Sequence, residues 1–464
     1  MQLFLFIKPH WPAFESAGLS PKELAKDLSS SESFQIRYIT DSLSKLSREL
    51  ERFISIQDLL SNPQKRDRAL TDQLAARGCY GLLDIHLKKT LAKWQDKPFQ
   101  NWESSSHLHE YYKFLYGHPA TFQRKTQDET QELAIENMRE TDRYYLISKL
   151  IFAADLRSRE TTFREQHSIE LIEPIIAWAK LVQETDPVIR FHLQVYLFYL
   201  KSDFDKLDFI QLLETYKVAF PYLSQSEAEY GYGKLFNHAN RQIVRGNYEF
   251  EYLLFDLSSF VIQAGLIDLN EQISHGGFLN FCSIGAACGH TDWVLSFIEN
   301  YKHKLPVKNR DLILDIGKSY VWIRGNNPIQ VIIQLYGIQS RDPQLQRRLY
   351  SLLIRAMYRA LVLGNYTNDS FQNQLQTSRR FLSQHRQLTP HSRHQYLNLI
   401  KGIRKLASLR QKIEKREQIY PEKIKTWFLN LKPITAGRWL GEELEKLLEP
   451  IEKKTGNKSP RLHS

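Results

Sequence analysis

Apolar residues recur along this chain of 464 residues at the spacing of an α-helix. They stand three and four positions apart, which places them on one face of a helix. One such stripe follows Gly246 and comprises Phe250, Leu254, Leu257 and Val261. Another follows Gly289 and comprises Val294, Phe297, Ile298 and Tyr301. Runs that alternate β-branched and polar residues are not evident, so the pattern predicts an all-α protein with few strands.

Each of these helical stretches begins just after a glycine that recurs along the chain. The recurring glycines are Gly246, Gly289, Gly325 and Gly364, between 36 and 43 residues apart. Glycine closes the last turn of a helix because it adopts the left-handed backbone conformation without a steric cost. Periods of this length are typical of helix-pair repeats, and one pair alone cannot bury its apolar stripe. We therefore expect a stack of helix pairs, an α-solenoid.

Other start and stop signals agree with this division into helices. An aspartate that can cap free amides precedes a proline already held at a helical angle at two places, Asp186-Pro187 and Asp342-Pro343. These pairs predict helix starts. Two apolar runs are followed by a proline, at Pro221 and at Pro306. Because proline disfavours helix in the residue before it, these positions predict helix ends.

The N-terminal region differs in pattern from the repeats. Ser20, Pro21 and Glu23 form a capping-box signature at the start of one short helix. A longer helix follows, with one apolar face made of Leu43, Leu46, Leu50 and Phe53. A short capped helix, a turn and a longer helix are typical of a winged-helix or helix-turn-helix unit, and equally of an ordinary helical hairpin.

Four regions follow from these patterns. Residues 1–60 are predicted to form a small helical or winged-helix-like module. Residues 61–200 form a helical region leading into the repeats, with polar breaks near NWESSSHLHE and RSRETTFREQHS. Residues 201–450 carry the repeats and end in a basic part. Residues 451–464 have no apolar periodicity and are predicted to be a disordered tail.

The stretch GHTDWVLSFIENYKHKLP resembles a recurring phrase of uncharacterised bacterial proteins built of degenerate tetratricopeptide-like repeats. The positions that carry the resemblance are Gly289, Asp292, Trp293, Phe297, Ile298, Glu299, Tyr301, Leu305 and Pro306. SLSKLSRELERF, HRQLTPHSRHQYLNLIKGIRKL and GRWLGEELEKL also look like segments of that group. The resemblance implies a stacked-helix scaffold that binds other macromolecules, and it brings no catalytic residue with it.

The net charge of +11 is unevenly distributed along the chain. Residues 341–416 hold 16 Lys and Arg against three acidic residues. This asymmetry indicates an acidic partner, nucleic acid included, although a solvated basic helix face is the commoner cause.

We find no secretory signal or membrane-spanning run. The three cysteines do not form a disulfide framework or a zinc pattern, so we expect a reduced, cytoplasmic protein without a membrane partner.

Motifs for catalysis, cofactors or metals are weak. YGYGKLF has glycines and a lysine but lacks the rest of a phosphate-binding loop, and a close helix contact explains it better. His107 and His109 lie on different faces of a helix, while His385, His391 and His394 fall in an arginine-rich junction. Cys282 and Cys288 are interpreted as buried thiols. We therefore predict no catalytic residue, no cofactor and no metal site.

The basic segment is the best candidate for a binding surface, because arginine holds phosphates and carboxylates through paired hydrogen bonds. Its candidate residues are Arg347, Arg348, Arg355, Arg359, Arg379, Arg380, Arg386 and Arg393. We favour a non-enzymatic scaffold for protein–protein interaction, with nucleic acid as a possible second partner. The alternative is a DNA-binding transcriptional regulator, in which the N-terminal module reads DNA and the solenoid senses or oligomerises.

Overall fold

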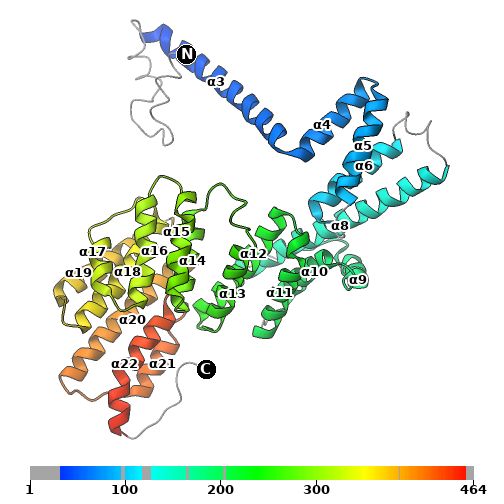
Figure 1. Ribbon diagram of the computed structural model, residues 1–464. Helices are drawn as coiled ribbons and strands as arrows, with labels where there is room; N and C mark the ends of the chain where they lie inside the picture. Colours follow the sequence, from blue (N-terminus) through cyan, green and yellow to red (C-terminus); the bar gives the residue numbers. More distant parts are fainter. Residues whose placement is uncertain are drawn as a thin grey trace. The chain divides into compact units, whose positions relative to one another are not determined.

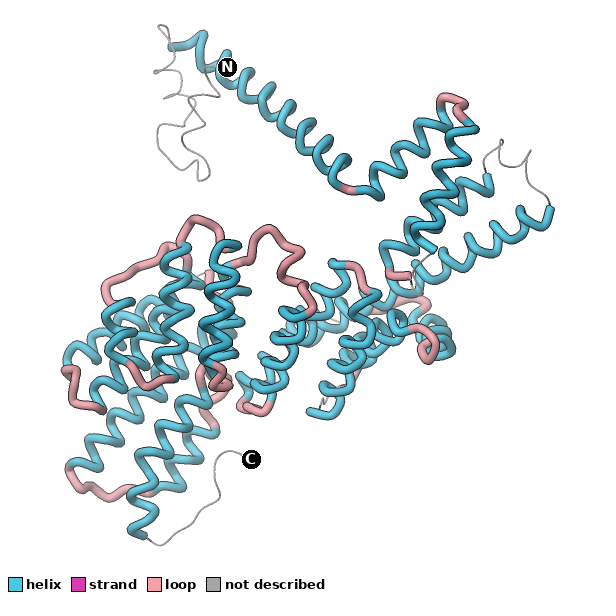
Figure 2. Tube along the Cα trace, viewed as in Figure 1, coloured by secondary structure: helices cyan, strands magenta, loops and turns pink. Residues whose placement is uncertain are grey.

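The computed structural model describes residues 32–95, 100–117, 127–163, 167–201, 205–385 and 387–455. Within these residues the ordered elements are all helices and no strand occurs, which confirms the predicted all-α class (Figures 1 and 2). None of the described helices is both long enough and apolar enough to cross a membrane. The chain divides into two compact units, Met1–Lys149 and Leu150–Ser464.

In its described residues, the first unit has four helices and the beginning of a fifth, which runs on into the second unit. They are α3 (Glu32–Ser61), α4 (Pro63–Ala76), α5 (Tyr80–Gln95), α6 (Trp102–Gly117) and α8 (Gln127–Phe163). A small core forms between α5 and α6, where large apolar side chains are removed from water. Its buried members are Leu83, Leu87, Trp94, Leu108, Tyr111, Tyr112 and Leu115.

The two polar breaks predicted in this part of the chain each lie beside a helix end, but most of the described residues of both stretches are helical. NWESSSHLHE begins α6, because Asn101 accepts hydrogen bonds from the amide and hydroxyl of Ser104 and so caps the helix. RSRETTF forms the last turns of α8 instead of a loop. There Arg157 pairs with Glu160 at 2.7 Å, which supports the helix. Polar residues that suggest loops therefore serve here as helix caps and ion pairs.

The N-terminal module is described only in part. The longer helix is confirmed as α3, which begins at Glu32. Ser20 and the short helix predicted with it lie outside the described residues, so the winged-helix-like reading stays a prediction. At the other end, α22 continues to Thr455, beyond residue 451 where we expected the tail to begin. Ile451 lies three residues after the buried Leu448 and so extends the same apolar face.

The described part of the second unit continues from α8 through fourteen further α-helices and two short 3₁₀ turns. They are α9 (Ile172–Val182), α10 (Pro187–Leu200), α11 (Lys206–Ala219), η3 (Phe220–Tyr222), α12 (Gln225–Arg245), α13 (Phe250–Gln263), α14 (His275–Ala287), α15 (Thr291–Tyr301), η4 (Lys302–Lys304), α16 (Arg310–Arg324), α17 (Pro328–Leu335), α18 (Pro343–Val362), α19 (Asn368–Gln384), α20 (Pro390–Glu414), α21 (Pro421–Leu429) and α22 (Gly437–Thr455).

These helices pack mainly on their near neighbours in the chain. Helices α14, α16, α18, α20 and α22 pack one on the next and form one layer. Helices α15, α17 and α19 each pack between two members of that layer and form a second one (Figure 1). Each helix pair thus buries its apolar stripe against adjacent pairs, as stacked helices require. The first layer lines the site described below.

The predicted helix ends are confirmed at all four recurring glycines, and the predicted left-handed conformation at three of them. Gly246, Gly289 and Gly364 have φ angles of 100°, 86° and 77°, in the left-handed region. Gly325 also follows the end of a helix, but its φ is −72°, and Asn326 adopts the left-handed conformation instead with φ 58°. Asparagine enters this region more readily than most residues, so it can take over the role of glycine.

The predicted starts and the proline stops also agree with the structure. The Asp186 carboxylate accepts the amides of Val188 and Ile189, and Asp342 accepts the amide of Gln344. Helix α11 ends at Ala219 and α15 ends at Tyr301, each followed by a 3₁₀ turn close to the predicted proline.

Candidate functional site

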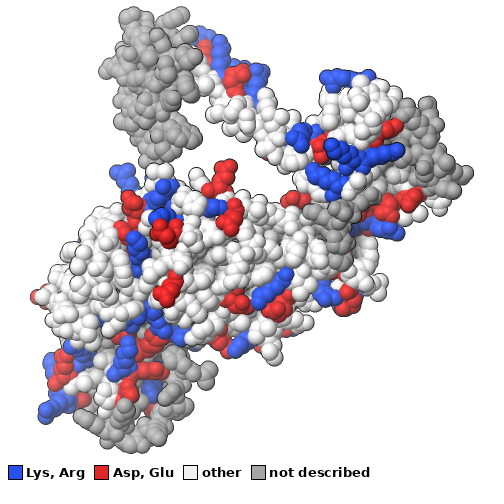
Figure 3. All heavy atoms as spheres, viewed as in Figure 1, with Lys and Arg blue, Asp and Glu red and all other residues white. Residues whose placement is uncertain are grey.

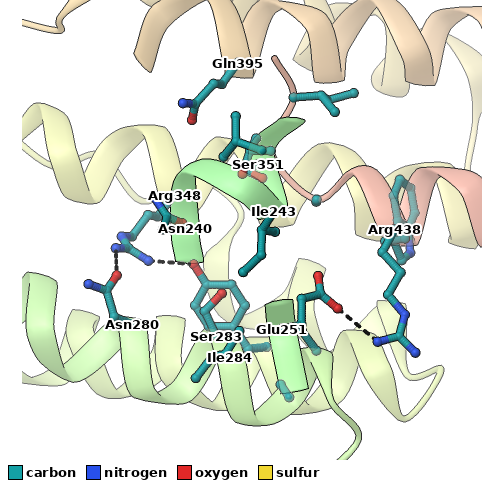
Figure 4. Close-up of a pocket in the computed structure, with 18 of the residues that line it drawn as sticks. Asn240, Ile243, Glu251, Asn280, Ser283, Ile284, Arg348, Ser351, Gln395 and Arg438 are labelled. Atoms are coloured by element: carbon teal, nitrogen blue, oxygen red, sulfur yellow. Dashed lines mark hydrogen bonds and ion pairs between the residues drawn. The ribbon is translucent and has the colours of Figure 1, made fainter. Parts of the chain in front are cut away.

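A cavity of about 560 Å³ opens on the first layer of helices in the second unit. Its walls come from α12, α13, α14, α16, α18, α20 and α22 together with the loop before α22 (Figure 4). The charged side chains of its described lining are unbalanced in favour of the basic ones. They are Arg324, Arg347, Arg348, Arg355 and Arg438 against Glu251 and Glu442.

Two of these arginines are paired with the two glutamates. Arg438 on α22 contacts Glu251 on α13 at 2.9 Å, and Arg324 on α16 contacts Glu442 on α22 at 2.9 Å. Burial raises the pKa of Glu251, and the ion pair with Arg438 only partly offsets this effect. These pairs tie α22 to the rest of the wall and neutralise both carboxylates.

Arg348 reaches across the cavity wall to two other helices. Its guanidinium donates to Asn280 Oδ1 at 2.6 Å and to the Tyr320 hydroxyl at 3.2 Å (Figure 4). Both partners are neutral in charge at pH 7. They therefore orient Arg348 without cancelling its charge.

Arg347 is held at the α20 side of the cavity. It donates to the Ser392 hydroxyl, and its guanidinium lies 5.2 Å from the centre of the Tyr396 ring. Its Nε atom is buried without a hydrogen-bond acceptor in the described structure. Hydroxyl and ring contacts again fix the position of the guanidinium and leave its positive charge in place.

Arg347, Arg348 and Arg355 have no carboxylate partner among the described residues, and Arg355 is the most buried of the three. Its residue is 7% exposed, its Nε donates to the Ser351 carbonyl at 3.0 Å, and its guanidinium lies 5.8 Å from the Trp439 ring. Burial, with a smaller contribution from the nearby Arg359, lowers the pKa of Arg355 to about 10. The Trp439 indole N–H is also buried without an acceptor among the described residues.

Within the part of the chain that the structure describes, no carboxylate lies within ion-pair distance of Arg347, Arg348 or Arg355. All three come from α18 and line one cavity. A buried cation without a counter-ion is costly, so such a wall suits an anionic ligand that brings its own oxygens.

The eight arginines predicted from the sequence do not form one surface. Arg359 lies one turn beyond Arg355 and forms a buried ion pair with Glu443. Arg379 and Arg380 are exposed on α19. Arg393 donates to the carbonyl oxygens of His385 and Leu388, and Arg386 lies outside the described residues. Of the seven predicted arginines that the structure describes, only Arg347, Arg348 and Arg355 therefore meet at the cavity.

Figure 3 shows how the basic and acidic side chains are distributed on one face of the molecule. On the face shown in Figure 3, basic side chains over the C-terminal helices are interspersed with acidic ones. The local excess of charge in residues 341–416 is thus partly internal and partly balanced by acidic residues that lie elsewhere in the sequence.

Several residues of the cavity escaped sequence reasoning because no motif links them. Asn280, Tyr320, Tyr396 and Trp439 come from four helices and meet only in the folded chain. One signal was present in the sequence, since Arg355 interrupts the apolar run LLIRAMY of α18. Arginine is seldom fully buried unless it is paired, so an arginine in such a run indicates a partner or a cavity.

The other sequence features have structural roles. Gly231 allows a close helix contact, because a Cβ there would come within 2.6 Å of Tyr216. His109 is hydrogen-bonded with Thr141 and Asn137. Burial raises the pKa of Cys288 to about 12, which favours the unreactive thiol. No group of three or more potential metal ligands occurs in the described ranges.

Comparison of the chain with models of protein families, with curated proteins and with solved structures gives no match. The site is therefore interpreted from its own geometry.

Proposed function

We propose that the protein is a non-enzymatic, tetratricopeptide-like α-solenoid scaffold that holds an acidic segment of a protein partner in its arginine-lined cavity. The observation that carries the proposal is Arg355, a buried cation that lines the cavity and has no carboxylate within ion-pair distance among the residues that the structure describes. Arg348 and Arg347 add two further charges on the same helix. The stacked arrangement of helix pairs supports the scaffold part of the proposal.

An acidic side chain in this cavity would lower the cost of burying the arginines. Carboxylate oxygens accept two parallel hydrogen bonds from one guanidinium, and such charge-assisted bonds are stronger than neutral ones. The Asn280 and Tyr320 contacts hold Arg348 in place before a ligand arrives. Less conformational entropy is then lost on binding.

The size of the cavity favours a segment of an acidic protein over duplex nucleic acid. About 560 Å³ accommodates a few side chains of an extended segment, and it lies within the usual range of ligand pockets. Duplex DNA instead requires a broad accessible basic surface. In α3, the basic Arg37, Lys45, Arg48 and Arg52 are offset by acidic neighbours, so we favour the scaffold over the DNA-binding regulator.

The experiment is fluorescence anisotropy of the full-length protein with a labelled glutamate-rich peptide, alongside a lysine-rich peptide of equal length. We expect saturable binding of the acidic peptide alone, weakening as salt increases. Arg355→Met keeps the length of the side chain but removes its charge, and we expect about a 10- to 100-fold loss of affinity. Arg379→Met is the matched control on the exposed face of α19 and should leave binding unchanged.

Circular dichroism of each variant shows whether the helices are retained. Equal binding of the acidic peptide by the wild type and a folded Arg355→Met variant would overturn the proposal. So would binding of mixed-sequence DNA that competes with the peptide and is lost on Arg379→Met, because the decisive arginines would then lie on the surface.

A further inference from the structure

Helix α3 in the first unit carries large apolar side chains that are open to solvent. Leu46, Leu50, Phe53 and Leu60 are 38%, 54%, 58% and 56% exposed. Ile54 and Ile56 flank them and are similarly exposed. A contiguous apolar surface of this kind is uncommon on a monomer and marks a site of interaction.

The spacing of this face identifies the kind of partner that fits it. Its positions alternate three and four residues apart and are Leu43, Leu46, Leu50, Phe53, Gln57 and Leu60. This repeat of 3.5 residues is the heptad pattern of a coiled coil, in which the seam of one helix stays against a partner with the same repeat. Ser55 and Arg48 occupy the opposite face, which is polar.

The apolar area is sufficient for a pair formed by two copies of α3. Each of the six exposed apolar residues is about half accessible and so hides roughly 100 Å² when covered. Two copies together would bury about 1,200 Å² from these side chains alone, which reaches the lower end of specific protein interfaces. A second copy supplies a helix with the same repeat and length.

We propose that α3 is a self-association helix that forms a parallel, in-register coiled coil with α3 of a second copy of the chain. Gln57 sets the direction and register. In a parallel pair its amide faces the same amide of the partner helix, and the two can exchange hydrogen bonds. In an antiparallel pair this amide would face an apolar residue. The inference does not depend on the ligand of the cavity.

The experiment is sedimentation velocity of the full-length chain over micromolar concentrations, with Leu50→Glu and Ser55→Glu variants. We expect the wild type to sediment as a dimer. Leu50→Glu places a charge in the seam and should give monomers, with at least a 10-fold weaker association. Ser55→Glu places the same charge on the opposite face of the helix and should remain dimeric.

The parallel direction of the two α3 helices is tested by oxidation of a Gln57→Cys variant. A parallel, in-register pair brings the two new thiols together and gives a disulfide-linked dimer, while the native cysteines serve as the background in the wild type. A monomeric wild type overturns the proposal, as does a Leu50→Glu variant that stays dimeric. Dimers that form only after residues 1–31 are deleted also overturn it, because the N-terminal segment would then be the occupant of this face.

Discussion

Arg359 and Glu443 lie 2.8 Å apart as a buried ion pair, although 84 residues separate them in the chain. The pair joins α18 to α22, the C-terminal helix that closes the cavity wall. Arg359 also donates to the Ile323 carbonyl and so connects α16 to the same point. One contact thus sets where Arg355 and Trp439 meet.

Removing one partner of this pair should destabilise the second unit strongly. Glu443→Leu leaves the Arg359 charge buried without a counter-ion, and we expect a loss of about 3–5 kcal/mol in the free energy of unfolding. Urea denaturation followed by amide hydrogen exchange in α18 and α22 measures it. The exposed pair Arg52–Glu49 is the control, and Glu49→Gln should change stability by less than about 0.5 kcal/mol. Equal effects of the two variants would contradict the prediction.

Two glycines of α12 should respond to alanine in opposite directions. A Cβ at Gly231 would lie 2.6 Å from Tyr216 and 2.7 Å from Phe191, whereas a Cβ at Gly233 would meet no described residue beyond the adjoining helix backbone within 4 Å. We expect Gly231→Ala to destabilise by about 1–3 kcal/mol through overpacking. Gly233→Ala should stabilise by up to about 1 kcal/mol through helix propensity. Thermal denaturation of both variants shows whether each substitution raises or lowers stability. A Gly231→Ala variant as stable as the wild type would refute the close contact.

The two glycines that follow α16 and α18 should also differ, despite their similar place in the repeat. Gly364 has φ 77°, so Gly364→Ala forces an L-residue into the left-handed region and should cost about 1 kcal/mol. Gly325 has φ −72°, which alanine adopts readily, so Gly325→Ala should lie within about 0.5 kcal/mol of the wild type. The urea concentrations at the unfolding midpoints of the two variants test this difference. Equal losses of stability would contradict the prediction.

His238 should make the second unit less stable in mild acid. Burial, followed by the nearby Arg241 and Arg245, lowers the pKa of His238 to about 3. Below about pH 6.5 the unfolded chain binds a proton at this histidine that the folded chain does not. Stability therefore falls by about 1.4 kcal/mol for each pH unit below 6.5, until the folded pKa is reached.

Denaturation at pH 7.0 and pH 5.5 measures this effect of His238. We expect the stability of the wild type to fall by about 1–1.5 kcal/mol between the two. His238→Gln should show a smaller fall because the titrating group is gone. His391→Gln is the control at an exposed histidine and should retain the slope of the wild type. A slope unchanged in His238→Gln would show that other groups cause it.

The local features of the fold followed from residue patterns because their causes are local. Asp342 caps α18 by accepting the amide of Gln344 in the first turn, and Gly246 closes α12 through its own backbone angle. Most of the described residues at NWESSSHLHE and RSRETTFREQHS are helical, because composition does not distinguish a capping residue from a loop residue. Whether such a residue caps a helix or lies in a loop depends on the groups to which its side chain forms hydrogen bonds.

The sequence by itself determined the all-helical class, many helix boundaries and the basic character of residues 341–416. Only the tertiary structure decided which arginines remain available to a ligand. Arg355 and Arg359 are one turn apart on α18, yet Glu443 neutralises Arg359, and no carboxylate of the described residues lies within ion-pair distance of Arg355. That distinction depends on contacts between distant helices, because electrostatic pairing follows distance in space and not separation along the chain.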